Sequence, residues 1–338
     1  MDEARRAALA RWLVRELGAS EVRVTRLDRL GGGAIQENWA VDLEVSGGHR
    51  AGAHPLVLRT SAPSAVAVSH DRLQEFAILQ RVHRAGVTCP EPWLACADQL
   101  VLGRPFYLMR RVAGEARPTR LVRDPLVAAH GDAIAARLGV ELARLHRIRP
   151  PDPALAFLEV PQGPVALARV ATYRQLLDSI DAASPVLEWA LRRLERAAPA
   201  TTELVLCHED LRTGNFLVEA GELSAILDWE FALWGDRHED LGWLLCRSWR
   251  FGRPQREVGG IGSRDTLYAG YEAEAGVVID RAIVPYWELM ASVRWAVIAL
   301  LQADRHFSGR EASLELALTA QVVPELERDI LDQLDAWR

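Results

Sequence analysis

The first third of the chain alternates apolar and polar residues in the manner of β-strands. Three such runs are separated by turns that contain glycine, and two shorter runs come later. Between them, Ala67–Ala85 has apolar residues at helical spacing and is predicted as a helix, with Gly86 as its end. The predicted strands are Val22–Leu30, Asn38–Val45, Pro55–Thr60, Trp93–Ala97 and Pro105–Val112.

The rest of the chain is predicted to be mainly helical. Apolar residues recur every three or four positions, and only Glu203–Asp228 interrupts this pattern with short apolar runs typical of strands. The clearest helices are Pro125–His146, Leu167–Ile180 and Pro185–Arg196. The first 20 residues also follow an amphipathic helical pattern.

This order of elements predicts an α+β fold with two lobes. A chain of 338 residues is longer than one hydrophobic core usually organises, so two compact parts are expected. We place a small β-rich lobe at residues 1–108, a hinge at residues 109–114, and a larger, mainly helical lobe at residues 115–338.

Composition and charge narrow the classes of function. The formal net charge is −6, so nucleic acids and anionic lipids gain no general electrostatic attraction, and no nucleic-acid partner is expected. The sequence contains no lysine, so all of its lysine-plus-arginine total is arginine. Chemistry that needs a lysine, such as a Schiff base or a Walker-type phosphate loop, is therefore excluded.

The cysteines and the apolar runs bear on where the protein works. The four cysteines form no Cys-x-x-Cys pair, which predicts free thiols in a reducing compartment. The N-terminal segment lacks the uninterrupted apolar core of a signal peptide, and Trp295–Leu301 is too short to cross a bilayer. We therefore expect a cytoplasmic protein without a membrane partner.

Residues 204–230, LVLCHEDLRTGNFLVEAGELSAILDWE, place polar residues at the ends of short apolar runs. Two of these runs flank the turn Glu219–Glu222 and predict a β-hairpin. Asn215 precedes the first strand of the hairpin and Asp228 follows the second, so their side chains are expected to converge. Asp210 lies one loop away from them.

Such a group of oxygen atoms favours a magnesium site. Two carboxylates and an amide oxygen near apolar strands are costly unless a cation balances them. Few protein oxygens suit Mg²⁺, which keeps water and takes phosphate oxygens as well. Asn215 and Asp228 would then hold the ion on a nucleotide, and Asp210 would orient and deprotonate a hydroxyl group. The alternative is that each residue only caps a turn, but three at this spacing favour the site.

The motif His208-x-Asp210-x4-Asn215, followed by Asp228-x-Glu230, resembles the signature of the aminoglycoside phosphotransferase family, whose fold is like that of protein kinases. The resemblance extends over most of the chain. It implies that Asp210 is the catalytic aspartate, that Asn215 and Asp228 ligate Mg²⁺, and that ATP is the phosphoryl donor.

Further residues near this signature have supporting roles by the same resemblance. Glu209 stands where the family usually has glycine. Asp236 and Asp240 open a predicted helix, where acids also suit the helix dipole. In the family, an acid in the position of Asp240 braces the catalytic loop. We assign a supporting role to Asp240 and to the motif residues His208 and Glu230.

The resemblance also implies a nucleotide site in the small lobe. Gly31, Gly32 and Gly33 lie between two strands, where glycine lets backbone amides approach phosphates, although a flexible turn explains them as well. Arg59 ends the third strand, where the fold has its phosphate-binding lysine, and Glu75 on the next helix would pair with it. The alternatives are an exposed arginine and a solvated glutamate.

The segment Phe106–Val112 resembles the hinge of the family. The adenine is expected to bond to backbone atoms around Met109, Arg110 and Val112. Together these features predict an enzyme that transfers the γ-phosphoryl group of ATP to a hydroxyl group of a small molecule, with ATP and Mg²⁺ as cofactors.

The acceptor is predicted from less specific features. Arginines and aromatic residues in and around residues 248–252, SWRFG, favour an acceptor with apolar and anionic parts, unless these aromatic residues belong to the core. The pattern is also similar to kinase-like domains associated with acyl-CoA dehydrogenases, which favours a hydroxyacyl-type acceptor.

Three other functions stay open at this point. A metal-dependent hydrolase could use Asp210 and Asp228, but it leaves Arg59 and the glycines unexplained. A non-catalytic, nucleotide-binding regulatory pseudokinase is disfavoured by the intact Asp210, Asn215 and Asp228. A protein kinase is disfavoured because the sequence has no Asp-Phe-Gly or Ala-Pro-Glu segment.

Overall fold

The structure is a computed structural model that describes residues 3–31, 36–61, 69–180, 182–200 and 203–337. The chain divides into two compact units. The first comprises Met1–Ala113, Pro153–Phe157 and Ser224–Phe231, and the second comprises Gly114–Asp152, Leu158–Leu223 and Ala232–Arg338. One unit is built on an antiparallel sheet and the other is mostly helical, so the predicted α+β class is confirmed. The lobe boundaries stay a prediction.

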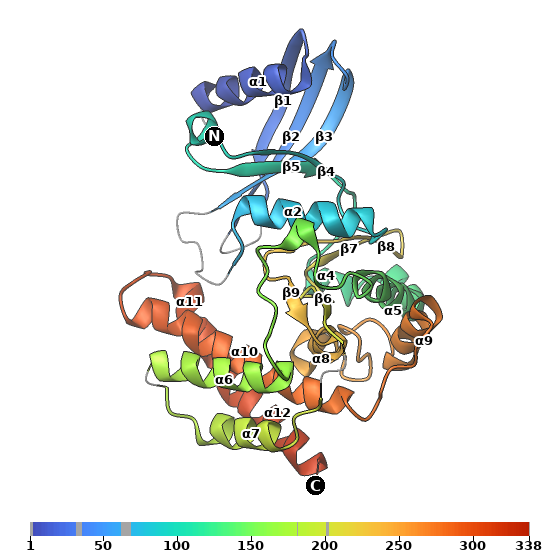
Figure 1. The fold of residues 1–338 in the computed structure, drawn as a ribbon, viewed down its shortest axis with the longest axis vertical. Helices are drawn as coiled ribbons and strands as arrows, with labels where there is room; N and C mark the ends of the chain where they lie inside the picture. Colours follow the sequence, from blue (N-terminus) through green and yellow to red (C-terminus); the bar gives the residue numbers. More distant parts are fainter. Residues whose placement is uncertain (1–2, 32–35, 62–68, 181, 201–202, 338) are drawn as a thin grey trace. The chain divides into compact units, whose positions relative to one another are not determined.

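The first unit contains a five-stranded antiparallel sheet with the strand order β1-β2-β3-β5-β4 (Figure 1). Its strands are β1 (Glu21–Arg29), β2 (Gln36–Ser46), β3 (Gly52–Ser61), β4 (Pro92–Cys96) and β5 (Phe106–Arg110). In β1, Val22 and Val24 are buried between exposed neighbours, as the two-residue period of a strand requires. All five strands overlap the ranges predicted from the sequence.

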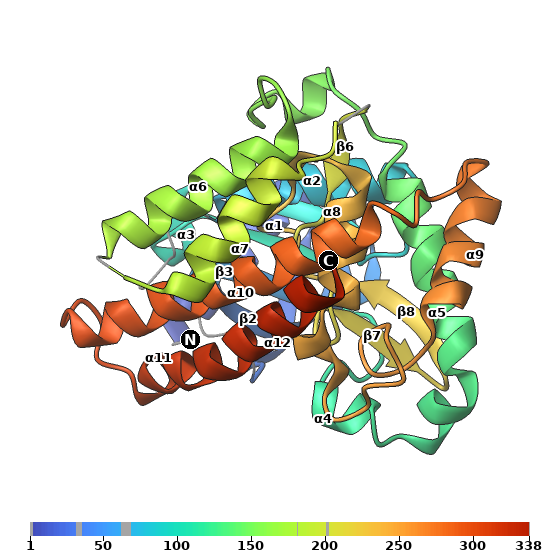
Figure 2. The same ribbon diagram turned by 90° about the horizontal axis from the view of Figure 1, so that it is seen from below.

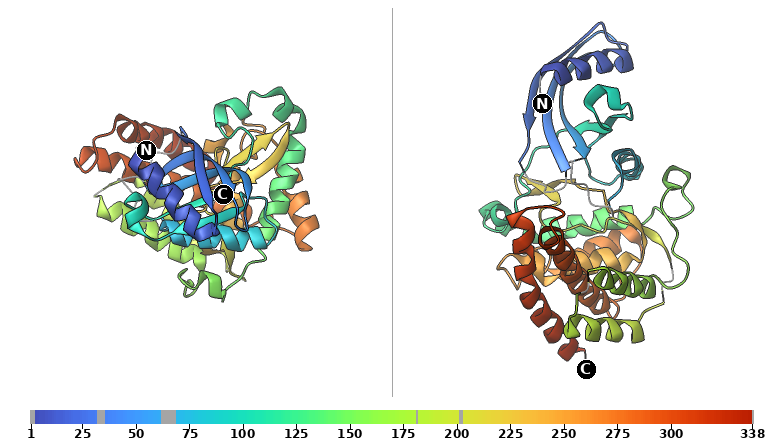
Figure 3. Two further views of the ribbon diagram at one scale, coloured as in Figure 1. Left: turned by 90° about the horizontal axis from the view of Figure 1, so that it is seen from above. Right: turned by 90° about the vertical axis from the view of Figure 1, so that its left-hand side faces the viewer.

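Helix α1 (Glu3–Leu17) covers one face of this sheet (Figure 3). Its buried side chains, including Leu9 and Leu13, pack in one cluster with inward-facing residues of β1 to β5. Trp12 meets the ring of Phe106 edge-on, with 5.1 Å between the ring centroids. The short helix α3 (Gln99–Leu102) joins the same cluster.

Helix α2 (Arg72–Arg84) contributes two buried charged residues, Arg72 and Glu75, which form an ion pair with each other. It begins after Asp71, whose carboxylate accepts the backbone N–H groups of Leu73 and Gln74. The sequence predicted this helix from Ala67, and residues 62–68 lie outside the described residues. Its buried residues include an apolar stripe and also, unusually, Arg72 and Glu75.

A core of the second unit surrounds helix α10 (Val284–Phe307). Apolar residues of α6 (Val165–Ser179), α7 (Pro185–Arg196) and α12 (Val323–Ala336) pack with it in one buried cluster. Figure 2 shows α6, α7 and α12 around this helix. Among the described residues, α10 alone is long and apolar enough to cross a membrane, and 61% of its most apolar window is buried inside the structure. A core helix commonly has these properties.

Helices α5 (Pro125–Leu145) and α9 (Arg264–Ala275) pack closely because glycines face the contact. A Cβ atom on Gly139 would lie 2.1 Å from the carbonyl oxygen of Leu267, and one on Gly270 would lie 2.0 Å from that of Ala136. Any larger residue at either position would therefore force the helices apart. This packing positions His146, which caps the C-terminal end of α5.

The predicted β segment Glu203–Asp228 forms three strands. After β6 (Val205–Cys207), β7 (Phe216–Glu219) and β8 (Glu222–Ile226) form the predicted hairpin. β6 pairs with β9 (Leu233–Gly235), a strand that the sequence did not predict. The remaining elements are α4 (Pro118–Leu121), α8 (Arg237–Leu245), α11 (Leu314–Thr319) and the 3₁₀ segments Pro153–Leu155, Arg247–Arg250 and Ala320–Val322.

Candidate active site

The predicted catalytic loop follows β6, and Asp240 binds its backbone. The N–H groups of His208 and Glu209 each donate to a different carboxylate oxygen of Asp240, at 2.8 Å. Asp240 is buried in the first turn of α8, which follows the capping residue Asp236. Asp240 therefore contacts the loop that it is predicted to brace.

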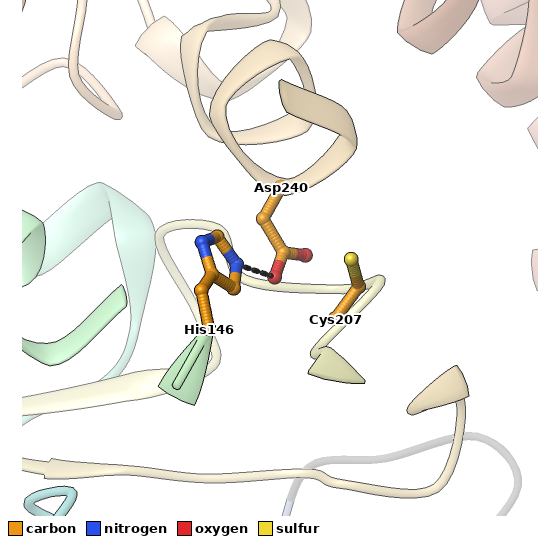
Figure 4. Close-up of side chains that lie close together, drawn as sticks. All are labelled: His146, Cys207 and Asp240. Carbon is orange, nitrogen blue, oxygen red and sulfur yellow. Dashed lines mark hydrogen bonds and ion pairs between the residues drawn. The ribbon is translucent and has the colours of Figure 1, made fainter. Parts of the chain in front are cut away.

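His146 also forms a hydrogen bond with Asp240 (Figure 4). Its Nε2 lies 3.1 Å from Asp240 Oδ2, and its Nδ1 lies 3.0 Å from the hydroxyl group of Tyr271. Burial by itself raises the pKa of the Asp240 carboxyl group, but the hydrogen bond and charge of His146 and the contacts of His208 outweigh burial, so this pKa lies below its ordinary value. Asp240 is therefore ionised in the folded protein.

Cys207 lies beside this pair, and the three side chains are close enough to one another to bind a metal ion (Figure 4). Both oxygens of Asp240 already accept backbone N–H groups, however. Burial and the nearby acids also raise the pKa of the Cys207 thiol well above its ordinary value, which disfavours the thiolate that a metal needs. We interpret the cluster as a structural support of the loop.

Glu209 has a backbone conformation that favours glycine. Its φ angle is 68°, in the left-handed region that costs a residue with a Cβ about 1 kcal/mol. The loop thus has a glycine-like backbone at the position where the resemblance leads one to expect glycine. The buried carboxylate of Glu209 pairs with Arg294 of α10, with 2.8 Å between Oε2 and Nη1. Arg294 thus balances the buried charge of Glu209.

The carboxylate of Asp210 accepts three side-chain hydrogen bonds. Asn215 Nδ2 donates to Oδ2 at 2.6 Å and also to the main-chain oxygen of Asp210 at 2.8 Å. Trp243 Nε1 and Arg212 Nε both donate to Oδ1, at 3.0 and 3.2 Å. The Asp210 side chain stays 14% exposed, so it is held firmly and can still reach a bound molecule.

The structure therefore brings together Asp210, Asn215, His208 and Asp240 in the second unit. Because Nδ2 of Asn215 points to Asp210, its Oδ1 is the atom left for a ligand. The predicted convergence of Asn215 with Asp228 joins residues of different units and stays a prediction.

In the first unit, Arg59 and Glu75 form the predicted ion pair. Arg59 Nε lies 2.9 Å from Glu75 Oε1, and both residues are buried. The other end of the guanidinium group donates to the carboxylate of Asp228. Asp228 has a φ angle of 66°, which aspartate tolerates better than most residues, and its side chain is 28% exposed. The predicted phosphate-binding residue thus contacts the predicted metal ligand.

Arg72 is part of this network, although the sequence reasoning missed it. It pairs with Glu75 and donates to Glu230 Oε2 at 3.1 Å. Burial and the nearby Asp228 raise the pKa of Glu230 to about 7, against the opposite effect of Arg59 and Arg72. The only signal in the sequence is the spacing of Arg72 three residues before Glu75, which places both on one face of a helix.

The predicted glycine loop is only partly described. Gly31 follows β1, whereas Gly32 and Gly33 lie outside the described residues. Their predicted contact with phosphates stays a prediction.

The predicted hinge residues lie at and after the end of β5. Met109 and Arg110 are the last residues of this strand, and the Arg110 N–H donates to the Glu91 carbonyl oxygen. The Arg111 N–H donates to Pro55. In the part of the chain that the structure describes, the Val112 N–H has no backbone partner, which makes it the hinge donor best placed for a ligand.

The aromatic residues after α8 pack mainly as core. Trp249 lies in a buried cluster with Trp243, and Trp287 lies in the core around α10. These tryptophans therefore belong to the core, which was the alternative to a role in binding the acceptor. Arg212 is different, because its guanidinium group lies beside Asp210 and over the Trp249 ring, and its side chain is 30% exposed.

These features define a class of protein, the small-molecule kinases with a protein-kinase-like fold. The structure of a putative aminoglycoside phosphotransferase from Ralstonia eutropha JMP134 matches with a TM-score of 0.75 at 18% identity, covering 98% of both chains. An ethanolamine kinase from Plasmodium vivax matches with a TM-score of 0.58 at 12% identity, covering 91% of this chain and 83% of that one.

Residues 26–277 match the phosphotransferase enzyme family, so the chain belongs to this family and is a small-molecule phosphotransferase. Human acyl-CoA dehydrogenase family member 11 is 27% identical over 292 residues, which cover 80% of this chain and 36% of that protein. Mouse acyl-CoA dehydrogenase family member 10 is 30% identical over 200 residues, which cover 56% of this chain and 18% of that protein. The chain thus spans a minor part of these curated relatives.

Proposed function

We propose that this chain transfers the γ-phosphoryl group of ATP to a hydroxyl group of a small molecule in a Mg²⁺-dependent reaction, with Asp210 as the catalytic base. The observation that carries the proposal is the Asp210 carboxylate, partly exposed and fixed by the Asn215 amide. Membership of a phosphotransferase family supports the reaction class.

In the proposed reaction, the acceptor oxygen attacks the γ-phosphorus and its proton passes to a carboxylate oxygen of Asp210. An oxygen–phosphorus bond forms, the bond to the bridging oxygen breaks, and ADP leaves with that electron pair. Because such transition states are loose, positioning of the hydroxyl group matters more than early proton removal. Arg59 would bind phosphate oxygens, and the Val112 N–H would bind the adenine.

Asn215 and Asp228 each carry an oxygen atom of a kind that suits Mg²⁺. Asn215 offers its Oδ1 because Nδ2 is bonded to Asp210, and Asp228 offers a partly exposed carboxylate. Mg²⁺ prefers oxygen ligands and completes its shell with water and phosphate oxygens. When bound, the ion would neutralise negative charge on the phosphates.

Asp228→Ala is expected to remove most of the gain in ATP affinity that Mg²⁺ provides. In the structure, Asp228 accepts a hydrogen bond from the guanidinium group of Arg59. The variant releases this arginine, so ATP binding without Mg²⁺ should be equal to that of the wild type or stronger. Calorimetric titration of ATP with Mg²⁺ and with EDTA measures both effects. An unchanged gain from Mg²⁺ would exclude Asp228 as a ligand.

Arg59→Met is expected to raise the KM for ATP about tenfold or more, because it removes a charge-assisted contact to phosphate while keeping a long apolar stem. The matched control is Arg23→Met on β1, whose side chain is exposed and pairs only with Glu44 among the described residues. The control should leave the KM unchanged. Equal KM values for both variants would contradict the role of Arg59.

For the acceptor, we propose a hydroxyacyl-type compound with an anionic part. Arg212 supports it, because a partly exposed guanidinium group beside the base favours negative charge on the acceptor. The names of the similar acyl-CoA dehydrogenase family members support an acyl compound.

Mg²⁺-dependent consumption of ATP with a panel of acceptors tests the proposed function. The panel contains small neutral alcohols, aminoglycosides and hydroxyacyl thioesters. Turnover with the thioesters and not with aminoglycosides is the expected result. ATP binding without turnover on any acceptor would favour a regulatory nucleotide-binding protein instead.

A further inference from the structure

We propose that Trp243 is a positioning residue that fixes the orientation of the Asp210 carboxylate through its indole N–H group. This inference rests on the proposed role of Asp210 as the base. Trp243 lies on α8, one turn after Asp240, so a single helix supports both the backbone of the loop and the side chain of the base.

Trp243 is the fixed one of the two donors to Asp210 Oδ1. It is 3% exposed, and its ring packs against Trp249 with 5.1 Å between the centroids. Arg212 donates to the same oxygen, but its side chain is long and 30% exposed. An acceptor can therefore displace Arg212 without disturbing the core, whereas Trp243 keeps its bond to Oδ1 throughout.

A chain of contacts connects Trp243 back to the catalytic loop. The guanidinium carbon of Arg294 lies 4.4 Å from the centroid of the Trp243 ring, and Arg294 also pairs with Glu209 at 2.8 Å. Glu209 is the residue before Asp210 and has the left-handed backbone conformation. Arg294 thus contacts both Glu209 of the catalytic loop and Trp243, which holds the carboxylate of the base.

Trp249 provides a matched control for the indole N–H of Trp243. It lies in the same aromatic cluster and is also buried. Its Nε1 has no hydrogen-bond partner among the described residues. Trp→Phe at either position keeps an aromatic ring beside a guanidinium group, that of Arg294 at position 243 and that of Arg212 at position 249. Only Trp243→Phe removes a hydrogen bond to Asp210.

Steady-state kinetics on the full chain test the consequence for catalysis. Trp243→Phe is expected to lower kcat about 10- to 100-fold, because a hydrogen bond to a charged group is lost, while the KM for ATP changes less than about twofold. Trp249→Phe should change both constants less than about threefold. Similar losses of kcat in the two variants, or a loss confined to the KM for ATP, would overturn the proposal.

Nuclear magnetic resonance of the indole groups tests the contact without any acceptor. In ¹⁵N-labelled protein, the Trp243 signal is the one missing from Trp243→Phe. Its proton shift is expected to move upfield in Asp210→Ala, and the Trp249 signal should stay in place. If the indole proton shift of Trp243 is unchanged in Asp210→Ala, the inference is refuted. If the wild type turns over no acceptor, the proposed function fails, and this measurement still decides whether Trp243 holds Asp210.

Discussion

Asp210→Asn is expected to lower phosphoryl transfer by about 10²- to 10⁴-fold, the usual range for removal of a general base. The amide cannot accept the hydroxyl proton. It also cannot satisfy all its neighbours, because its NH₂ group would face a donor on Asn215 or on Trp243. Asp210→Ala is expected to have a similar effect. Rates of ADP release with a working acceptor measure both variants.

Binding of ATP should survive these changes, because Arg59 and the hinge belong to the first unit and do not depend on Asp210. Calorimetric affinity for Mg·ATP within a few-fold of the wild type is the expected control result. Asp265→Asn, at an exposed position on α9, is the matched surface variant and should be neutral. Turnover retained by both Asp210 variants would remove Asp210 as the base.

Asp240→Asn is expected to reduce the free energy of unfolding at pH 7 by about 3 kcal/mol or more. Asp240 is fully buried and accepts hydrogen bonds from His208, Glu209 and His146. Asparagine keeps one acceptor oxygen and turns an NH₂ group toward a donor, so a buried N–H loses its partner. Urea denaturation of the variant and of the wild type measures the difference, again with Asp265→Asn as the control.

The destabilisation should depend on pH in a defined direction. The pKa of Asp240 is lowered in the folded protein, so its ionised form stabilises the fold above the unfolded pKa, and this stability is lost as the pH falls through the folded pKa. The difference in free energy of unfolding between the wild type and Asp240→Asn is therefore largest near neutral pH and becomes smaller below about pH 4. If this difference in unfolding free energy stays constant down to pH 3, the charge of Asp240 contributes little to the stability of the fold.

Much of the fold follows from local patterns. The strands of the first sheet and the hairpin after Asn215 were predicted because each has alternating or continuous apolar runs between turn residues. β9 was missed because Leu233–Gly235 has only three residues and owes its extended form to pairing with β6, which lies 26 residues or more away in sequence. Such a pairing leaves no period in the sequence.

The site was predictable to the extent that its chemistry lies in one segment. Asp210 and Asn215 are five residues apart and meet as expected. Trp243 and Arg294 come from distant helices, and their residue types are usual in a core or on a surface, so only the folded chain shows that they gather at the base. Arg72 was missed for a related reason. An arginine is rarely buried unless acidic side chains surround it, and the sequence alone does not show which acids the tertiary structure brings to Arg72.

The arginine at position 59 has a consequence for chemical labelling. Reagents that mark nucleotide sites by acylating the amine of a conserved lysine find no such group on any side chain of this protein. A guanidinium group stays protonated and is a poor nucleophile at neutral pH. Proteome-wide surveys of kinases with such probes would therefore pass over this enzyme even where it is abundant and active, and affinity capture on immobilised nucleotides would be needed to detect it.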